Sequence, residues 1–155
     1  MVNIGDILPR DCTSAQAKAG SRKKALEAAS ELLAERFPEF SARALFDELM
    51  NRERLGSTGL GEGVAIPHCR IPCKHIVGAF LKLEDPVDYD AMDDQPVDLL
   101  FVLVVPPLEA TAHLDVLAAL ARVFENPESR RRLRAQTSDG ALYEELIGLA
   151  SNDAA

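Results

Sequence analysis

VDLLFVLVV, residues 97–105, is apolar at almost every position. A run of this kind is typical of a central strand that is covered on both faces, because a strand with one wet face alternates apolar and polar residues. Pro106 and Pro107 follow directly and end the strand, since proline cannot continue its ladder of hydrogen bonds. The segment therefore predicts the buried centre of a β-sheet.

Helices and weaker strands are predicted on the N-terminal side of this segment. Residues 76–83 alternate well enough for a second strand, residues 64–66 form a short apolar triplet, and residues 11–19 are a weak strand candidate. Ser21 and Ser41 can each cap a helix. The apolar face of the first helix is Leu26, Ala29, Leu33 and Phe37, and that of the second is Leu45, Phe46 and Leu49.

The last third of the chain predicts three more helices, begun by Thr111, by Asn126 before Pro127, and by Ser138. We expect Leu114, Leu117, Ala118, Ala121 and Phe124 to face inward in the first of them, and Leu142, Leu146 and Leu149 in the last. Helices, then strands, then helices is an order that predicts an α/β sandwich with a mixed sheet.

Length and charge exclude several classes of function. The 155 residues predict one domain, 1–155, and carry 17 Lys+Arg against 25 Asp+Glu, a net charge of −8. That charge argues against nucleic acid and against an anionic membrane surface as partners. We expect no membrane insertion and no signal peptide, because no apolar run reaches about 18 residues and the N-terminus lacks a basic and apolar leader. Three cysteines suggest reduced thiols in the cytoplasm.

Residues 52–70, RERLGSTGLGEGVAIPHCR, are where chemistry is expected. Closely spaced glycines often serve only a turn or close packing, but here they lead into an apolar triplet and then Pro67. Pro67 stiffens the backbone and presents His68 at the exit of a buried strand. The stretch is not a Walker A loop, which needs Lys-Ser or Lys-Thr, and not a Rossmann fingerprint, whose glycines follow the strand.

A metal site is the alternative explanation for His68 and its neighbours. His68, Cys69, Cys73 and His75 are all good zinc ligands. Their spacing is poor, because the first two are adjacent and Pro72 stiffens the turn. We therefore predict no metal and no cofactor, with the cysteines as small buried or half-buried thiols and His75 on the surface. A zinc hydrolase is kept as an outlying alternative.

The run from Glu53 to Cys69 resembles the phosphorylation-site signature of type-2 enzyme IIA domains of the bacterial phosphoenolpyruvate-dependent phosphotransferase system, in its mannitol, fructose and nitrogen branches. That signature is an acidic residue, six positions, Leu-Gly, and then Val-Ala-Ile-Pro-His and a small residue, all of which are present. The GSTGLG stretch and the lack of attached sugar-transport domains are most similar to the nitrogen-regulatory branch. The resemblance implies a three-layer α/β/α sandwich with a mixed central sheet.

For function, the resemblance implies phosphoryl transfer through histidine. His68 would accept the phosphoryl group from a histidine phosphocarrier protein, because a neutral imidazole is a competent nucleophile near pH 7. Arg52 matches a position that contacts phosphate, and His113 one that stabilises the phosphoryl group from the start of a helix. Ser57 and Thr58 are candidate hydroxyl partners from the same loop.

The resemblance also implies partner proteins, namely kinases and potassium transport systems that are regulated by the phosphorylation state of this protein. Two alternatives stay open: a sugar-specific enzyme IIA that passes the phosphoryl group to a separate enzyme IIB, and a purely binding module. One departure from the family pattern is Cys69, where glycine is common. Its thiol would be sensitive to oxidation if Arg70 lowered its pKa.

Overall fold

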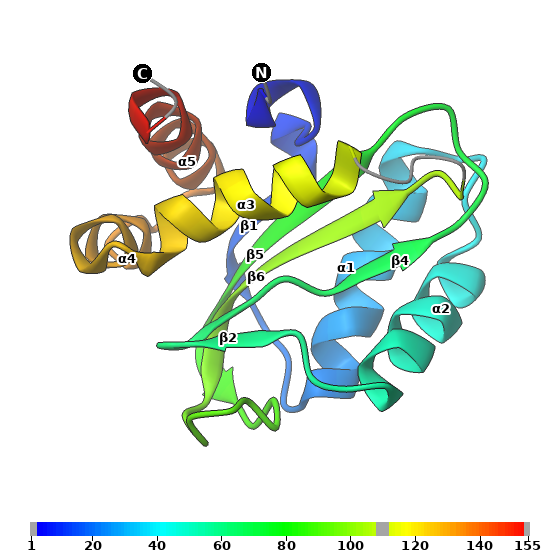
Figure 1. Ribbon diagram of the computed structural model, residues 1–155, viewed down its shortest axis with the longest axis horizontal. Helices are drawn as coiled ribbons and strands as arrows, with labels where there is room; N and C mark the ends of the chain where they lie inside the picture. The colour runs from blue at the N-terminus through cyan, green and yellow to red at the C-terminus, as the bar shows by residue number, and fades with distance from the viewer. Residues whose placement is uncertain (1–2, 108–111, 154–155) are drawn as a thin grey trace.

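The structure is a computed structural model that describes residues 3–107 and 112–153. Two short 3-10 turns, η1 and η2, precede a run of strands and helices, and the chain ends in three helices (Figure 1). In chain order the elements are η1 Ile4–Asp6, η2 Arg10–Cys12, β1 Thr13–Ala17, α1 Arg22–Arg36, α2 Ala42–Arg54, β2 Gly59–Gly61, β3 Val64–Ala65, β4 His68–Arg70, β5 Val77–Val87, β6 Val97–Val105, α3 Ala112–Glu125, α4 Pro127–Arg134 and α5 Asp139–Asp153.

Strand β6 is the centre of the sheet, as its apolar sequence predicts. The strand order is β1-β5-β6-β3-β2, and β4 also pairs with β6, further along the same edge as β3. β5 runs antiparallel to β6, whereas β3 and β4 run parallel to it and β1 runs parallel to β5. The predicted mixed sheet is confirmed.

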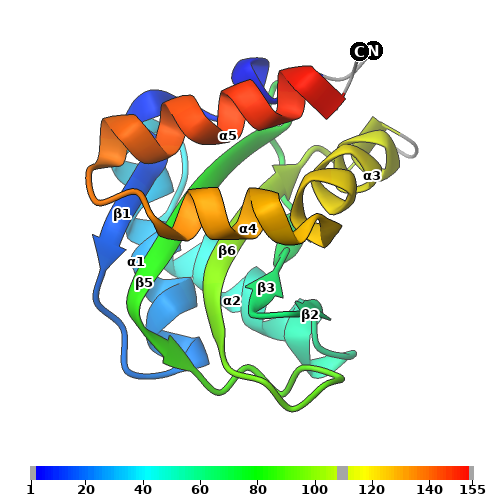
Figure 2. The same cartoon turned by 90° about the vertical axis from the view of Figure 1, so that its left-hand side faces the viewer.

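Helices cover both faces of this sheet. Figure 2 shows α3, α4 and α5 on the near side and α1 and α2 behind. On the near side the ring of Phe124 in α3 packs on Phe80 of β5, with centroids 5.9 Å apart. On the other side Ala25 of α1 lies in one buried cluster with Leu100 of β6. The predicted three-layer α/β/α sandwich is therefore confirmed.

The face that α3 turns inward is predicted only in part, since Phe124 is buried and Leu117 packs against the core as expected. Leu114 is 55% exposed and Ala118 is also exposed, while the buried residues are Val116, Leu120, Val123 and Phe124. The error arises because Ala118, Ala119 and Ala121 make several helical faces look equally apolar, so spacing alone does not fix the rotation of the helix. Thr111, the predicted cap, lies outside the described residues.

Two strands that were not predicted, β2 and β4, flank the glycine-rich stretch. β2 pairs with β3 through a two-residue turn, in which Glu62 and Gly63 have φ values of 57° and 80°. A turn with two positive φ values matches the twist of a tight hairpin. Glycine suits this positive φ, and a Cβ at Gly63 would also displace the guanidinium of Arg134, which bonds the Glu62 carbonyl and Asp98. The hairpin directs the chain through β3 toward His68.

Strand β5 is longer than predicted, since it continues past residue 83 to Val87 after an irregularity in its pairing with β6. Its added residues Glu84, Asp85 and Pro86 are exposed and carry no apolar alternation to reveal them. Within residues 3–107 and 112–153, no helix is long and apolar enough to cross a membrane.

Candidate functional site

His68 is the first residue of β4, and the backbone places it firmly. The carbonyl of Pro67 accepts a hydrogen bond from the Leu103 N–H of β6 at 2.9 Å. The half-buried imidazole has its Nδ1 2.9 Å from the carbonyl oxygen of Ile66. Because a carbonyl can only accept, Nδ1 carries the ring proton in this contact. The lone pair of the neutral ring is then on Nε2.

Arg52 contacts that lone pair from the last turn of α2. Its Nε donates to His68 Nε2 at 3.3 Å, and its Nη1 donates to the Gly56 carbonyl at 2.9 Å. The two contacts specify the same tautomer of His68, since Nε2 accepts in one and Nδ1 donates in the other. Sequence reasoning placed both residues in one site, and the structure brings them together.

A cavity of about 510 Å³ opens beside His68 and is lined in addition by Arg52, Arg70, His113, Leu55 and Glu48. His113 belongs to the first turn of α3, whose N-terminal end carries a partial positive charge. Its Nδ1 is buried and has no hydrogen-bond partner among the residues that the structure describes. The cavity therefore combines two arginines and two histidines with one carboxylate, Glu48, beside the first turn of α3, and the excess of cationic and hydrogen-bonding groups suits an oxyanion.

The surroundings of His68 disfavour its protonated form. Burial lowers the pKa of His68 below its usual value of 6.5, and the nearby Arg52 and His113 lower it further, against an opposing effect of the hydrogen bond to Ile66. His68 is consequently neutral at pH 7, the state in which imidazole acts as a nucleophile.

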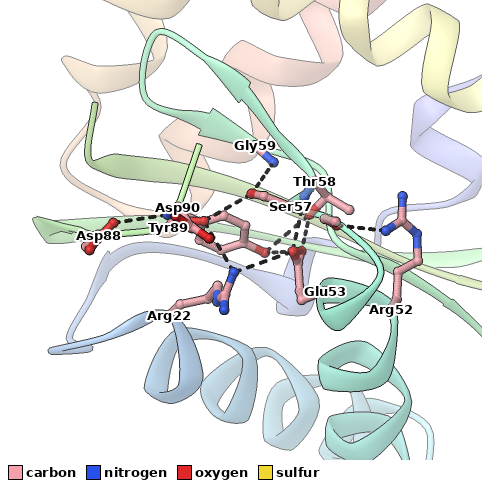
Figure 3. Close-up of polar contacts among 10 residues, drawn as sticks. Arg22, Arg52, Glu53, Ser57, Thr58, Gly59, Asp88, Tyr89 and Asp90 are labelled. Carbon is pink, nitrogen blue, oxygen red and sulfur yellow. Dashed lines mark hydrogen bonds and ion pairs between the residues drawn. The ribbon is translucent and has the colours of Figure 1, made fainter. Parts of the chain in front are cut away.

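The hydroxyls of Ser57 and Thr58 are engaged by Tyr89 and Glu53 (Figure 3). Ser57 Oγ donates to the carbonyl of Tyr89 at 3.0 Å, and the buried Thr58 hydroxyl bonds the carboxylate of Glu53. Neither residue is among those described as lining the cavity. The structure thus does not bring these two candidates to His68, because the loop turns them toward the protein interior.

The three cysteines are free thiols in the described chain, and Cys69 is buried beside the cavity. Burial raises the pKa of Cys69 to about 12, with a smaller contribution from Glu48. The hypothesis that Arg70 lowers this pKa is therefore wrong. Arg70 instead donates to the Pro107 carbonyl at 3.2 Å.

The metal alternative can be compared with the same region. Cys69 and Cys73 are buried and half-buried, and His75 is exposed, as predicted. Within the described ranges 3–107 and 112–153, no three His, Cys, Asp or Glu side chains are grouped so that they could hold a metal ion.

Thiol labelling follows the burial of the cysteines. We expect iodoacetamide at pH 7.5 to modify Cys73 first, because Cys69 and Cys12 are buried and burial raises the pKa of each to about 12. Peptide mass spectrometry of the native protein checks the order, with labelling in denaturant as the control that exposes all three. Faster modification of Cys69 than of Cys73 would show a reactive thiol at the site.

Comparisons with known proteins agree with this geometry. The family model described as phosphoenolpyruvate-dependent sugar phosphotransferase system, EIIA 2, matches residues 6–148. The nitrogen regulatory protein of Pseudomonas aeruginosa is 42% identical over 148 residues, which cover 95% of this chain and 96% of that protein. The chain therefore belongs to the EIIA 2 family of the phosphotransferase system, whose members act in phosphotransfer.

Solved structures support both the family and the fold. The crystal structure of the nitrogen regulatory protein IIA-Ntr from Neisseria meningitidis has a TM-score of 0.86 and 40% identity, covering 95% of this chain and 98% of that one. The mannitol enzyme IIA of Escherichia coli, solved in a complex with phosphorylated enzyme IIB, has a TM-score of 0.68 at 21% identity and covers 88% and 92%. The first similarity assigns this chain a phosphocarrier and regulatory role, and the second extends to the fold alone.

Proposed function

We propose that His68 is the phosphoryl acceptor and that it takes the group from the phosphohistidine of a carrier protein. The observation that carries the proposal is the neutral His68 with its Nε2 lone pair at a cavity lined by Arg52 and Arg70. Nε2 forms the new bond to phosphorus while the bond to the donor imidazole breaks, and the donor nitrogen keeps that electron pair. The ring of His68 gains positive charge, which the Ile66 carbonyl stabilises through Nδ1–H.

Arg52 and His113 stabilise the transferred group in this proposal. Arg52 Nε, which donates to Nε2 in the free protein, is placed to donate to a phosphoryl oxygen once Nε2 is bonded to phosphorus. The unpartnered Nδ1 of His113 supplies a further hydrogen-bonding group, and the α3 N-terminus favours negative charge. Phosphoryl transfer needs mainly such positioning and charge stabilisation.

The lowered pKa of His68 sets the pH dependence of uptake. Protonation occupies Nε2 and blocks attack, so uptake falls as pH drops through the pKa of His68. Because that pKa is below 6.5, we expect the midpoint of the decline in uptake to lie below pH 6.5. Single-turnover uptake and an NMR titration of His68 should share one midpoint. A midpoint above 6.5 in both would contradict the account.

Carrier docking is proposed around two exposed leucines. Leu55 lines the cavity and is 85% exposed, and Leu114, next to His113, is 55% exposed. Exposed apolar groups at a reactive centre are typical of a protein interface. We expect Leu55→Glu and Leu114→Glu each to weaken carrier binding by roughly tenfold, measured as the carrier concentration for half-maximal uptake. Met92→Glu, at a residue 93% exposed and outside the cavity lining, is the matched control. Equal effects of all three would contradict this docking surface.

For the partners, we propose that phosphorylation of His68 is a signal read by target proteins such as kinases and potassium transport systems. The names of the relatives that are about 40% identical favour regulation over the sugar-specific alternative. A phosphoryl group adds up to about two negative charges at the cavity, enough to change an interface. We place the protein in the cytoplasm, where its free cysteines would stay reduced. Pulldowns with phosphorylated and unphosphorylated protein test the signal, and identical partner sets would exclude it.

A further inference from the structure

Glu53 is a buried carboxylate for which the transfer chemistry has no direct use. It follows Arg52 in α2 but points into the protein, and it is only 4% exposed. Its carboxylate accepts from the Thr58 N–H at 3.1 Å, from the Thr58 hydroxyl, and from the Tyr89 hydroxyl at 2.7 Å (Figure 3). Arg22 Nη1 approaches it at 4.0 Å.

Three hydrogen bonds, joined through the backbones of Thr58 and Ile66, link this carboxylate to His68. Glu53 holds the N–H of Thr58, and the carbonyl of Thr58, on the other side of its Cα, accepts from the Ile66 N–H at 3.1 Å. The carbonyl of Ile66 then accepts from His68 Nδ1 at 2.9 Å. The final contact is the one that keeps the lone pair on Nε2.

The same residue also supports Arg52. The backbone carbonyl of Glu53 accepts from the Gly56 N–H at 3.1 Å, and the Gly56 carbonyl accepts from Arg52 Nη1 at 2.9 Å. Ser57 and Arg22 both donate to the Tyr89 carbonyl, so the far side of the loop is held as well. The His68 ring and the Arg52 guanidinium are therefore both anchored to the loop that follows α2, but the contact that supports Arg52 uses only the backbone of Glu53.

The carboxyl group of Glu53 is a better explanation of function than of stability. Removing a carboxyl group from water is costly, and apolar packing of similar volume is often at least as stable as a buried polar group. Both of its oxygens face donors, Oε2 the Thr58 N–H and Oε1 the hydroxyls of Thr58 and Tyr89, whereas an amide would turn an N–H toward one of these sides. The carboxyl group therefore fixes the orientation of the Thr58 peptide.

We propose that Glu53 is a positioning residue that, through Thr58 and Ile66, sets the tautomer and orientation of His68. This inference rests on the proposed function of His68. Without Glu53, the Ile66 carbonyl would no longer be fixed in front of Nδ1. The His68 ring could then adopt the tautomer with the proton on Nε2, which has no lone pair at the attacking atom. Misplacing a reacting group by about 1 Å costs roughly 10²-fold in rate, so we expect a loss of up to that size.

The test joins ¹⁵N NMR of the imidazole ring to single-turnover phosphoryl uptake. In wild type we expect His68 to be protonated at Nδ1 only. In Glu53→Gln we expect a mixture of tautomers and uptake lower by up to roughly 10²-fold. Ser30→Ala removes a buried hydroxyl that bonds Leu26 away from the path, and it controls for loss of stability alone.

Several outcomes decide the matter. If Glu53→Gln folds and leaves both the tautomer and the uptake rate unchanged, Glu53 does not position His68. If it fails to fold, Glu53→Asp, which withdraws the carboxylate from the Thr58 N–H by one methylene, must shift the tautomer in the same direction, or the inference is wrong. If the wild-type protein takes up no phosphoryl group, the proposed function is overturned. A tautomer shift in Glu53→Gln would in that case still support the positioning role.

Discussion

Replacing His68 with glutamine is expected to reduce phosphoryl uptake to background, a loss of at least roughly 10³-fold. Glutamine has a similar length and can still form hydrogen bonds, but it has no nucleophilic ring nitrogen. The measurement is formation of acid-labile phosphate after incubation with phosphoenolpyruvate, enzyme I and the carrier protein. The effect is the largest that we predict, because no other group would form the bond to phosphorus.

His75→Gln is the matched control for this experiment. His75 is seven positions further along the chain and exposed, and it is outside the described lining of the cavity. We expect its variant to accept phosphoryl groups at the wild-type rate. Full uptake by His68→Gln, or a loss of uptake in His75→Gln alone, would show that the acceptor is assigned to the wrong histidine.

Replacing Arg52 with glutamine is expected to slow uptake by about 10²–10³-fold without preventing it. This is the range found when one preorganised donor to a developing negative charge is removed. Arg52→Lys should recover only part of the rate, because an ammonium lacks the planar fork that donates at both His68 and Gly56. Stopping the uptake reaction at defined times and measuring the bound phosphoryl group gives the rate constant for each variant.

Arg52→Gln is also expected to change the pH dependence of uptake. Arg52 is one of the groups that lower the pKa of His68, so its removal raises that pKa and moves the acid limb of uptake to higher pH. Arg54→Gln is the matched control, since Arg54 is exposed in the same helical turn and bonds Asn51. A rate loss in Arg52→Gln with no shift of the acid limb would contradict the direct contact with His68.

Long apolar runs and specific motifs were the features that the sequence allowed us to predict. The apolar run 97–105 predicted the central strand correctly. Every residue of that run except the half-buried Asp98 is buried. The inward face of α3 was only partly predicted, with Leu114 and Ala118 misplaced, because alanine is compatible with several faces of a helix. β2 and β4 were missed because three-residue strands carry too little alternation to be recognised.

In the site, the pairing of His68 with Arg52 followed from the family motif, and the structure brings the two side chains together. The positions of Ser57, Thr58 and Glu53 could not be predicted, because their partner Tyr89 is more than 30 residues away in the chain. Nothing near Tyr89 resembles a motif. A buried carboxylate surrounded by donors becomes visible only when the fold brings those segments together.

The most direct test of the central claim locates the phosphoryl group on the wild-type protein. The protein is phosphorylated through enzyme I and the carrier protein, and ¹⁵N–³¹P NMR with peptide mass spectrometry then identifies the modified atom. We predict one phosphoryl group per chain, bonded to Nε2 of His68. A phosphoryl group on Nδ1 of His68 or on any other residue, or no uptake at all, would contradict the account.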